Sequence, residues 1–187
     1  MRLAILGGGG FRVPLVYGVL LRDTHERRVD EVVLYDVDPQ RLAAIASVLH
    51  QMAADSALDP DAPPPPRVLT TTDLDTALSG VDFVFSAIRV GGLRGRTCDE
   101  RVALDLGVLG QETAGPGGLA YGLRTLPVAM DIAARARRLS PNAWVINFTN
   151  PAGMITQAMQ SVLGPRVIGI CDSPLGLGKR AARALGR

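Results

Sequence analysis

Short apolar stretches recur along the chain, and each is followed by a longer stretch in which apolar residues return at helical spacing. The short stretches predict buried strands, and the longer ones predict the helices that connect them. The expected strands are residues 2–6, 31–35, 67–71, 82–88, 143–148 and 166–170. The expected helices are residues 11–22, 38–54, 72–78, 97–106, 121–139, 151–163 and 175–187. This alternation is typical of an α/β fold with a doubly wound, mainly parallel sheet of six strands.

The whole chain, residues 1–187, is expected to form one domain, because a chain of this length can bury a sizeable core around one sheet. Five prolines within residues 59–66 predict a surface loop, and the glycine-rich stretch 107–118 predicts an irregular one. Right-handed crossovers between parallel strands would place a ligand at the carboxyl ends of the strands.

Composition narrows the class of protein. Hydrophobic residues make up 47% of the chain, which fits a globular domain, and the net charge of +2 gives no argument for a nucleic-acid or acidic-membrane partner. The apolar residues 13–21 are too few to span a bilayer, and no charged leader precedes them, so we expect neither a membrane anchor nor a signal peptide. Two widely spaced cysteines, Cys98 and Cys171, are typical of free thiols in a cytoplasmic protein.

Four consecutive glycines, residues 7–10, lie between the first expected strand and the first expected helix. This is the context of a Rossmann-type dinucleotide-binding turn, in which glycine lets the backbone approach a diphosphate and the helix N-terminus faces the anion. We therefore expect Gly7, Gly9, Gly10, Phe11 and Arg12 to contact the cofactor. The third glycine position of the consensus holds Arg12, so a glycine turn that serves packing alone is the alternative.

An acidic residue, Asp36, ends the second expected strand. A carboxylate at this place can accept hydrogen bonds from both ribose hydroxyls, which favours NAD over NADP. Arg41 lies close in sequence and is a second candidate cofactor contact, because its guanidinium could pair with a 2′-phosphate instead. The alternative for Asp36 is a solvated strand end or a helix cap.

Two polar residues near later strand ends are candidates for binding a sugar. Arg96 follows the fourth expected strand, and its guanidinium fork suits a sugar phosphate, although a surface ion pair with Asp99 or Glu100 is the alternative. Asn150 follows the fifth expected strand, where its amide can hydrogen-bond a sugar hydroxyl or hold the nicotinamide side of the site. The alternative for Asn150 is a helix cap.

Cys171 ends the sixth expected strand, beside a helix start. A thiolate is favoured near a helix N-terminus or a metal ion, and an ordinary half-buried cysteine is the alternative. Glu112 lies in the glycine-rich stretch, which is long enough to fold over the site. A structural hydrogen-bonding role and a chemical role both stay open for this residue.

Three motifs in the second half of the chain go beyond a general dinucleotide-binding pattern. They are Arg89-Val90-Gly91-Gly92-Leu93 with Arg96-x-x-Asp99-Glu100, then Gly110-Gln111-Glu112-Thr113 with Gly115-Pro116-Gly117-Gly118, and finally Asn147-Phe148-Thr149-Asn150-Pro151-Ala152-Gly153 with Gly169-Ile170-Cys171-Asp172-Ser173-Pro174. In this order, the motifs resemble family 4 of the glycoside hydrolases, the NAD- and metal-dependent glycosidases that include the 6-phospho-glucosidases. The resemblance covers essentially all 187 residues. The sequence departs from the family pattern at Gly10, where the family usually has serine.

The resemblance implies a mechanism in which NAD oxidises C3 of the sugar, a tyrosine removes the C2 proton, and a divalent metal, typically manganese, stabilises the enediolate. The glycosidic oxygen then leaves, water adds, and the hydride returns. It further implies that Cys171 is a metal ligand and that Arg96 binds the 6-phosphate of a phosphorylated disaccharide or glucoside. The family's metal-binding histidine and catalytic tyrosine would lie beyond residue 187, so we expect this chain to lack the C-terminal catalytic region. A homo-oligomer is also expected.

The resemblance leaves open whether the substrate is an α- or a β-glucoside. Family members with aspartate after the cysteine are often 6-phospho-α-glucosidases, in which that aspartate acts as the acid, so Asp172 is a candidate catalytic residue. Ser173 does not complete the α pattern, and the opening Gly-Gly-Phe-Arg-Val-Pro resembles a branch with the β activity, so we favour a 6-phospho-β-glucosidase.

Two functions outside the glycosidases also fit a dinucleotide-binding turn. One is a lactate- or malate-type dehydrogenase, which has a similar Asn-Pro after strand five. The second is a nucleotide-sensing module, which would bind NAD without turning over a phosphoglycoside. A need for metal would distinguish the glycosidase from the dehydrogenase, and turnover of a phosphoglycoside would distinguish it from the sensing module.

Overall fold

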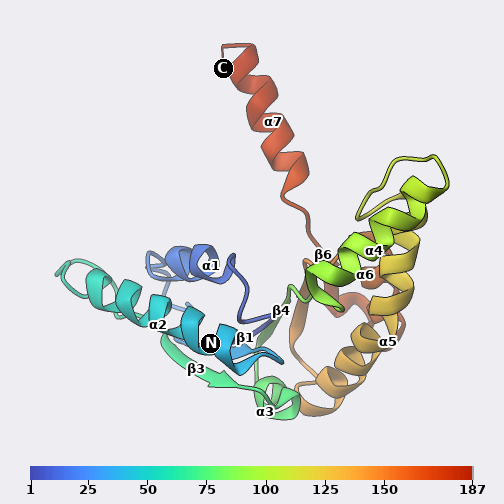
Figure 1. The fold of residues 1–187 in the computed structure, drawn as a ribbon. Helices are drawn as coiled ribbons and strands as arrows, with labels where there is room; N and C mark the ends of the chain where they lie inside the picture. Colours follow the sequence, from blue (N-terminus) through green and yellow to red (C-terminus); the bar gives the residue numbers. More distant parts are fainter. Residues whose placement is uncertain (187) are drawn as a thin grey trace.

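Six strands form one sheet in the computed structural model of the chain, which describes residues 1–186 (Figure 1). All neighbouring strands are parallel, in the order β3-β2-β1-β4-β5-β6, so the predicted sheet is confirmed. The strands are β1 (Arg2–Leu6), β2 (Glu31–Tyr35), β3 (Arg67–Thr71), β4 (Phe83–Ser86), β5 (Trp144–Asn147) and β6 (Val167–Gly169). The order reverses between β1 and β4, where the chain has crossed from one half of the sheet to the other. Such a reversal leaves a crevice at the carboxyl ends of the strands.

The connecting helices are those that the helical spacing predicts, with shifted ends. They are α1 (Val13–Leu20), α2 (Pro39–Ser56), α3 (Leu74–Leu78), α4 (Gly92–Asp105), α5 (Gly115–Leu139), α6 (Ala152–Leu163), the 3-10 turn η1 (Gly164–Arg166) and α7 (Ser173–Ala184). Aspartates begin two of them: the carboxylate of Asp38 accepts the amides of Gln40 and Arg41, and that of Asp73 accepts the amide of Thr76. Arg187, the last residue of the expected final helix, lies outside the described residues.

The prediction of an irregular loop over residues 107–118 is wrong at its end, because α5 begins at Gly115. Pro116 sits in the first turn, where a missing amide proton costs little. Gly117 and Gly118 serve close packing instead of a bend: a Cβ at either would lie 2.5 Å from the carbonyl oxygen of Gln111 or Thr113. The preceding helix also begins earlier than predicted, at Gly92 instead of residue 97.

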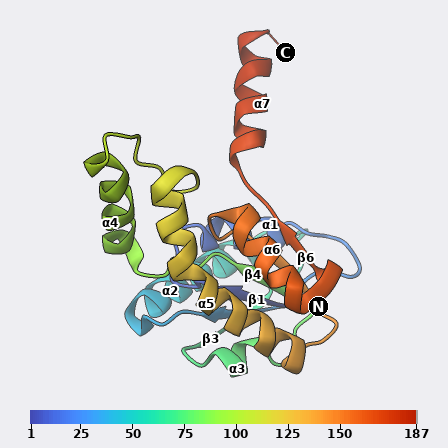
Figure 2. The same ribbon diagram turned by 90° about the vertical axis from the view of Figure 1, so that its right-hand side faces the viewer.

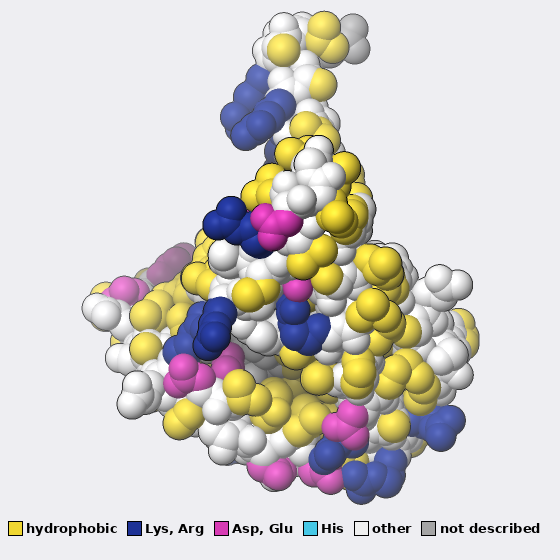
Figure 3. Space-filling view, turned by 45° about the vertical axis from the view of Figure 1, so that its right-hand side comes forward, with side chains coloured by type: hydrophobic (Ala, Val, Ile, Leu, Met, Phe, Trp, Pro, Cys, Tyr) yellow, Lys and Arg dark blue, Asp and Glu magenta, His cyan; other side chains and the backbone are white. Residues whose placement is uncertain are grey.

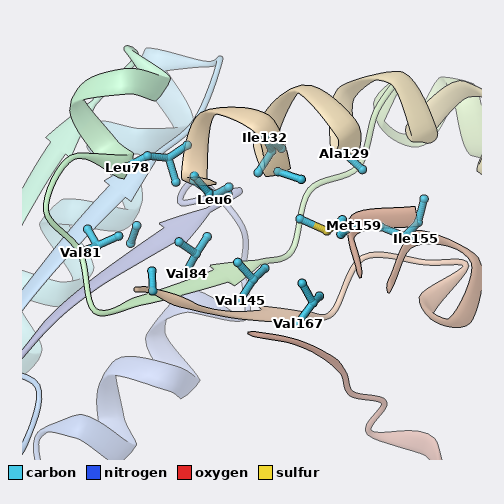
Figure 4. Close-up of a cluster of buried hydrophobic side chains, with 14 residues drawn as sticks. Leu6, Leu78, Val81, Val84, Ala129, Ile132, Val145, Ile155, Met159 and Val167 are labelled. Atoms are coloured by element: carbon cyan, nitrogen blue, oxygen red, sulfur yellow. The ribbon is translucent and has the colours of Figure 1, made fainter. Parts of the chain in front are cut away.

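The core lies on both faces of the sheet because side chains alternate along each strand. On β1, Leu3 and Ile5 pack with the helices α1 and α2, whereas Ala4 and Leu6 face the layer that contains α3, α5 and α6. Figure 4 shows this second layer, with Val84 and Val145 of the sheet under Ile132 of α5.

One helix, α7, stands apart from the two layers and projects away from the sheet (Figures 1 and 2). Residues 171–181 are all exposed. Among residues 1–186, no helix has the length and the apolar composition that crossing a membrane requires.

Candidate functional site

The parallel sheet brings segments that are distant in sequence to one edge. The turns that follow the carboxyl ends of β1, β4, β5 and β6 contain, in that order, Gly7, Arg89, Asn150 and Cys171. Eight of the eleven residues for which the sequence predicts a binding or catalytic role lie in these four turns, whereas Asp36 and Arg41 follow β2 and Arg96 lies in α4. The geometry of each turn therefore decides what the edge can bind.

The glycine turn after β1 is held against the end of β2. The amides of Gly7 and Gly8 both donate to the carbonyl oxygen of Tyr35, at 3.0 and 2.7 Å, and the amide of Gly9 donates to Oδ2 of Asp36 at 2.9 Å. A Cβ on Gly9 would lie 2.8 Å from Cβ of Arg41 and 2.9 Å from that same carboxylate oxygen. Gly9 is thus required by the close approach of the Arg41 and Asp36 side chains.

Asp36 accepts a second hydrogen bond, from the amide of Asp38 to Oδ1 at 3.1 Å. Its carboxylate therefore joins the glycine turn to the start of α2, beside the position where a ribose would lie in a dinucleotide fold. Arg41 is exposed on the first turn of α2 and makes no ion pair within residues 1–186. Both of the expectations for this pair, ribose binding and phosphate pairing, stay predictions.

The turn ends in free donors that suit an anion. No acceptor within residues 1–186 takes the backbone amides of Phe11 and Arg12, which directly precede α1. Gly10 donates to the carbonyl oxygen of Gly7 at 2.9 Å and closes the turn. Free amides at a helix N-terminus bind phosphate well, so the turn fits a dinucleotide diphosphate.

Arg12 links this turn to the far side of the edge. Its guanidinium lies 5.1 Å from the ring centroids of both Phe11 and Phe148, and Nη2 donates to Oδ2 of Asp172 at 3.0 Å. The predicted cofactor residue Arg12 and the predicted catalytic residue Asp172 are therefore brought together, although they are 160 positions apart in sequence. In this arrangement Asp172 is a hydrogen-bond acceptor.

Buried polar groups support the turn after β5. Asn147, which is fully buried, donates from Nδ2 to the carbonyl oxygen of Thr149 and to Oγ1 of Thr156, both at 3.1 Å. Oγ1 of Thr149 accepts the amide of Ile88 at 3.1 Å, which ties the turns after β4 and β5 together. These interactions present Asn150, whose peptide bond to Pro151 is cis, at the surface of the edge. Asn147 and Thr149 were not among the predicted site residues, and their signal was a polar residue at the end of a buried strand.

A charged cluster surrounds Glu112. Its Oε1 accepts from Nη2 of Arg89 at 2.7 Å, and its Oε2 lies 3.3 Å from Nη1 of Arg96. Nδ2 of Asn150 lies 3.5 Å from Oε1. Arg96 also donates from Nε to Glu100 at 2.7 Å, and this hydrogen bond, with the charge of Glu112, raises the pKa of the Arg96 guanidinium. The predicted pair Arg96 and Asn150 are thus joined by Glu112, and Arg89 is a member that was not predicted.

A third arginine, Arg124, connects α5 to α4 beside this cluster. Arg124 of α5 donates to both carboxylate oxygens of the buried Asp99 of α4, and its Nε donates to the carbonyl oxygen of Val90 at 3.0 Å. The ring of Tyr121 lies between this guanidinium and that of Arg89, with centroid distances of 5.5 and 5.6 Å. Burial raises the pKa of Tyr121, and the charge of Arg89 opposes that rise.

Cys171 is exposed and free, and lines a groove of about 440 Å³ beside α6, together with Gly153, Thr156 and Ile170. Within residues 1–186, no three side chains of histidine, cysteine, aspartate or glutamate come close enough to hold a metal ion. Both histidines, His25 and His50, precede β3 and therefore belong to the opposite half of the sheet. The described residues do not form a metal site by themselves, because Cys171 is a single donor.

The sheet order and the glycine turn define the class of protein as a Rossmann fold. A family model described as "Family 4 glycosyl hydrolase" matches residues 2–187. The chain belongs to this glycosyl hydrolase family. The resemblance drawn from the three motifs is confirmed.

Relatives of both anomeric types are similar to the chain. It is 41% identical over 180 residues to the 6-phospho-beta-glucosidase of Escherichia coli (strain K12), a match that covers 95% of this chain and 39% of that protein. It is 38% identical over 184 residues to 6-phospho-alpha-glucosidase 1 of Lacticaseibacillus paracasei, covering 97% of this chain and 40% of that protein. The chain thus spans about two fifths of the length of these relatives.

Solved structures give the same result for the fold. The 6-phospho-beta glucosidase from Thermotoga maritima, solved with manganese, NAD+ and glucose-6-phosphate, has a TM-score of 0.87 at 31% identity, covering 100% of this chain and 44% of that chain. A lactate dehydrogenase from Cryptosporidium parvum has a TM-score of 0.61 at 21% identity, covering 91% and 44%, and shares the fold alone. The family match therefore decides against the dehydrogenase alternative.

Proposed function

We propose that this chain is the cofactor-binding part of an enzyme that hydrolyses 6-phospho-glucosides. The observation that carries the proposal is the edge of the sheet: the free amides of Phe11 and Arg12 and the charged cluster around Glu112 lie after neighbouring strands. The turn after β1 suits a diphosphate, and the charged cluster after β4 suits a sugar phosphate. The family membership and the bound molecules of the Thermotoga maritima relative support the same arrangement.

The cofactor we propose is NAD, which would take the hydride from C3 of the sugar and return it. The turn of Gly7, Gly9 and Gly10, with the amides of Phe11 and Arg12, would hold its diphosphate. Asp36 and Arg41 would face the adenosine ribose. For manganese, the chain offers Cys171 as one soft donor only, and we assign it no further step.

In the segments after β4 and β5, Arg96 would bind the 6-phosphate of the substrate and Asn150 a sugar hydroxyl. We favour the β anomer. In an α enzyme Asp172 would have to deliver a proton to the leaving oxygen, whereas here it accepts a hydrogen bond from Arg12. The paired carboxylate supports a role in fixing the turn before α7, and the α activity stays the alternative.

The test uses the full-length protein with chromogenic α- and β-glucoside 6-phosphates, with and without NAD and manganese. We expect release from the β substrate alone, and only when both additions are present. Asp172→Asn should then leave the choice of anomer unchanged, because the residue is not the acid for a β substrate. Release from the α substrate, abolished by Asp172→Asn, would establish the alternative, and no release from either would remove the proposed function.

Two further features of the protein belong to this proposal. Both cysteines are free and exposed, which supports a reducing compartment, the cytoplasm. Apolar side chains spread over much of the surface in Figure 3, and Leu104, Leu109 and Leu123 of the α4–α5 region are more than half exposed. Such a surface supports a homo-oligomer in which a second copy covers it.

A further inference from the structure

Glu112 occupies the centre of the charged cluster, and the proposed function gives it no task. Its side chain is 18% exposed, less than those of Arg89 at 32% and Arg96 at 42%. Its two oxygens are divided between the two guanidinium groups, one each. The carboxylate therefore sets how far apart the two cations lie.

Each arginine keeps a nitrogen that Glu112 does not use. Nη1 of Arg89 is buried and has no hydrogen-bond partner within residues 1–186. Arg96 uses Nε for Glu100 and Nη1 for Glu112, and its Nη2 makes no ion pair in the same part of the chain. A buried, unpaired donor on a charged group is costly, and a ligand oxygen would satisfy it.

We propose that Glu112 is a positioning residue that holds Arg89 beside Arg96, so that both guanidinium groups bind the phosphate of a phosphorylated sugar. Two adjacent cations repel each other, and a carboxylate between them removes most of that repulsion and fixes both forks before the ligand arrives. The contact with Nδ2 of Asn150 fixes the neighbouring sugar-binding amide in the same step. This inference rests on the proposed function, because that function supplies the sugar phosphate.

The rival role for Glu112 is that of a competitor, in which the carboxylate fills the place that the phosphate would take. The two roles predict opposite changes in the affinity for a sugar phosphate when the carboxylate is removed. Loss of a positioning carboxylate weakens the binding of a sugar phosphate, whereas loss of a competing carboxylate strengthens it.

The experiment measures the dissociation constants of glucose 6-phosphate, glucose and NAD by calorimetry in the full-length protein. We expect Glu112→Ala to weaken glucose 6-phosphate binding by about tenfold or more, the scale of a lost charge-assisted hydrogen bond, and Glu112→Gln to weaken it less. NAD should bind as in the wild type, because it does not use the two arginines. Glucose should lose much less affinity than glucose 6-phosphate, because it depends on Glu112 only through Asn150. Asp105→Asn, which removes one exposed negative charge from the end of α4, is the matched control and should change nothing.

Arg89→Met supplies a second measurement that does not depend on how the Glu112 loop folds. It should weaken glucose 6-phosphate binding as much as Glu112→Ala does. The double variant should lose little more affinity than either single variant, because both substitutions act through one phosphate contact. Equal or tighter binding of glucose 6-phosphate by Glu112→Gln, or additive losses in the double variant, would overturn the inference. Failure of the wild-type protein to bind glucose 6-phosphate would instead overturn the proposed function, and the inference with it.

Discussion

Gly9 has little space around it in the turn after β1, although a Cβ on Gly7 would lie closer to its neighbour, 2.5 Å from the carbonyl oxygen of Ala87. A methyl group on Gly9 would meet both Arg41 and the carboxylate of Asp36, which accepts the Gly9 amide. We expect Gly9→Ala to push Asp36 off the turn, to lower the free energy of unfolding by about 1–3 kcal/mol and to weaken NAD binding by at least about tenfold. Calorimetric titration with NAD and urea unfolding measure both effects.

Gly153 offers the control for this substitution. It lies near the start of α6, in the same edge of the sheet, and a Cβ there would meet nothing within 4 Å. Gly153→Ala should therefore keep NAD affinity and leave the protein as stable as before or slightly more so, since alanine favours helix. If the two variants bind NAD equally well, the turn does not hold the cofactor.

Single residues of the site were predictable where a local pattern required them. Strand-end position and turn chemistry indicated Asp36 and the glycines, and the motif order indicated Arg96 and Asn150. Arg89 and Glu112 are 23 positions apart, and nothing in their local sequence says that one pairs with the other. Such a pairing depends on how α4 and α5 pack, which the sequence alone does not give.

The α4–α5 pair is the element that carries the charged cluster, and the ion pair between Asp99 and Arg124 holds it together. Asp99 is 5% exposed, and Arg124 also donates to the carbonyl oxygen of Val90 at the start of α4. Asp99→Asn would leave the partly buried guanidinium of Arg124 without its counter-charge. We expect a loss of about 2 kcal/mol in the free energy of unfolding, below the value for a fully buried pair because Arg124 is partly exposed.

Urea unfolding measures this loss, and amide hydrogen exchange locates it. Exchange should accelerate in residues 89–114 and stay unchanged in β1 and β2, which lie in the other half of the sheet. Arg101→Gln, an exposed change on the same helix, should leave both measurements as in the wild type. Faster exchange over the whole chain would show that the pair stabilises the fold in general and not this element.

The strands were the best predicted elements, because each is a short apolar run between turn signals, and only their ends shifted. The helix starts were predicted less well. Gly91 begins α4 in a left-handed conformation, with φ 82°, and the glycines of α5 pack against a loop. Glycine in sequence indicates a break as readily as it indicates close packing, and only the tertiary contacts separate the two.

At the opposite end of α5, Arg135 and Arg138 hold the carboxylate of Asp75 on α3, each at 2.8 Å. These hydrogen bonds lower the pKa of Asp75 below its usual value. Because the folded pKa is the lower one, the stability that this group contributes is complete above the unfolded pKa of about 3.9 and is lost as the pH falls through the folded pKa. Stability therefore falls on the acid side.

The check compares wild type with Asp75→Asn by urea unfolding at neutral pH and at about pH 2.5, below the unfolded pKa. The variant should be the less stable protein at neutral pH, and the difference in the free energy of unfolding should narrow in acid, as the pH approaches the folded pKa. Asp55→Asn on α2, whose carboxylate makes no ion pair within residues 1–186, should show no gap at either pH. A gap for Asp75→Asn that is unchanged in acid would mean that the two arginines do not act through its charge.

On the scale of the whole molecule, the reversal of strand order between β1 and β4 decides where chemistry can occur. The helices α1 and α2 cover one face, and α3, α5 and α6 cover the other. A reversal of strand order leaves a crevice at the carboxyl ends of the strands. The glycine turn and the charged cluster lie on either side of this reversal. A dinucleotide with its diphosphate at the turn would therefore extend its nicotinamide toward the cluster.

This placement predicts how the whole fold responds to nucleotide. At a concentration 100 times its dissociation constant, NAD should add about 2.7 kcal/mol to the free energy of unfolding, which for a chain of this length raises the melting temperature by roughly 5–10 °C. NADP at the same concentration should raise it much less, because its 2′-phosphate would face the carboxylate of Asp36. An equal shift with NADP would mean that Arg41, exposed beside that carboxylate, pairs with the phosphate instead. No shift with either nucleotide would mean that the amides of Phe11 and Arg12 do not receive a diphosphate.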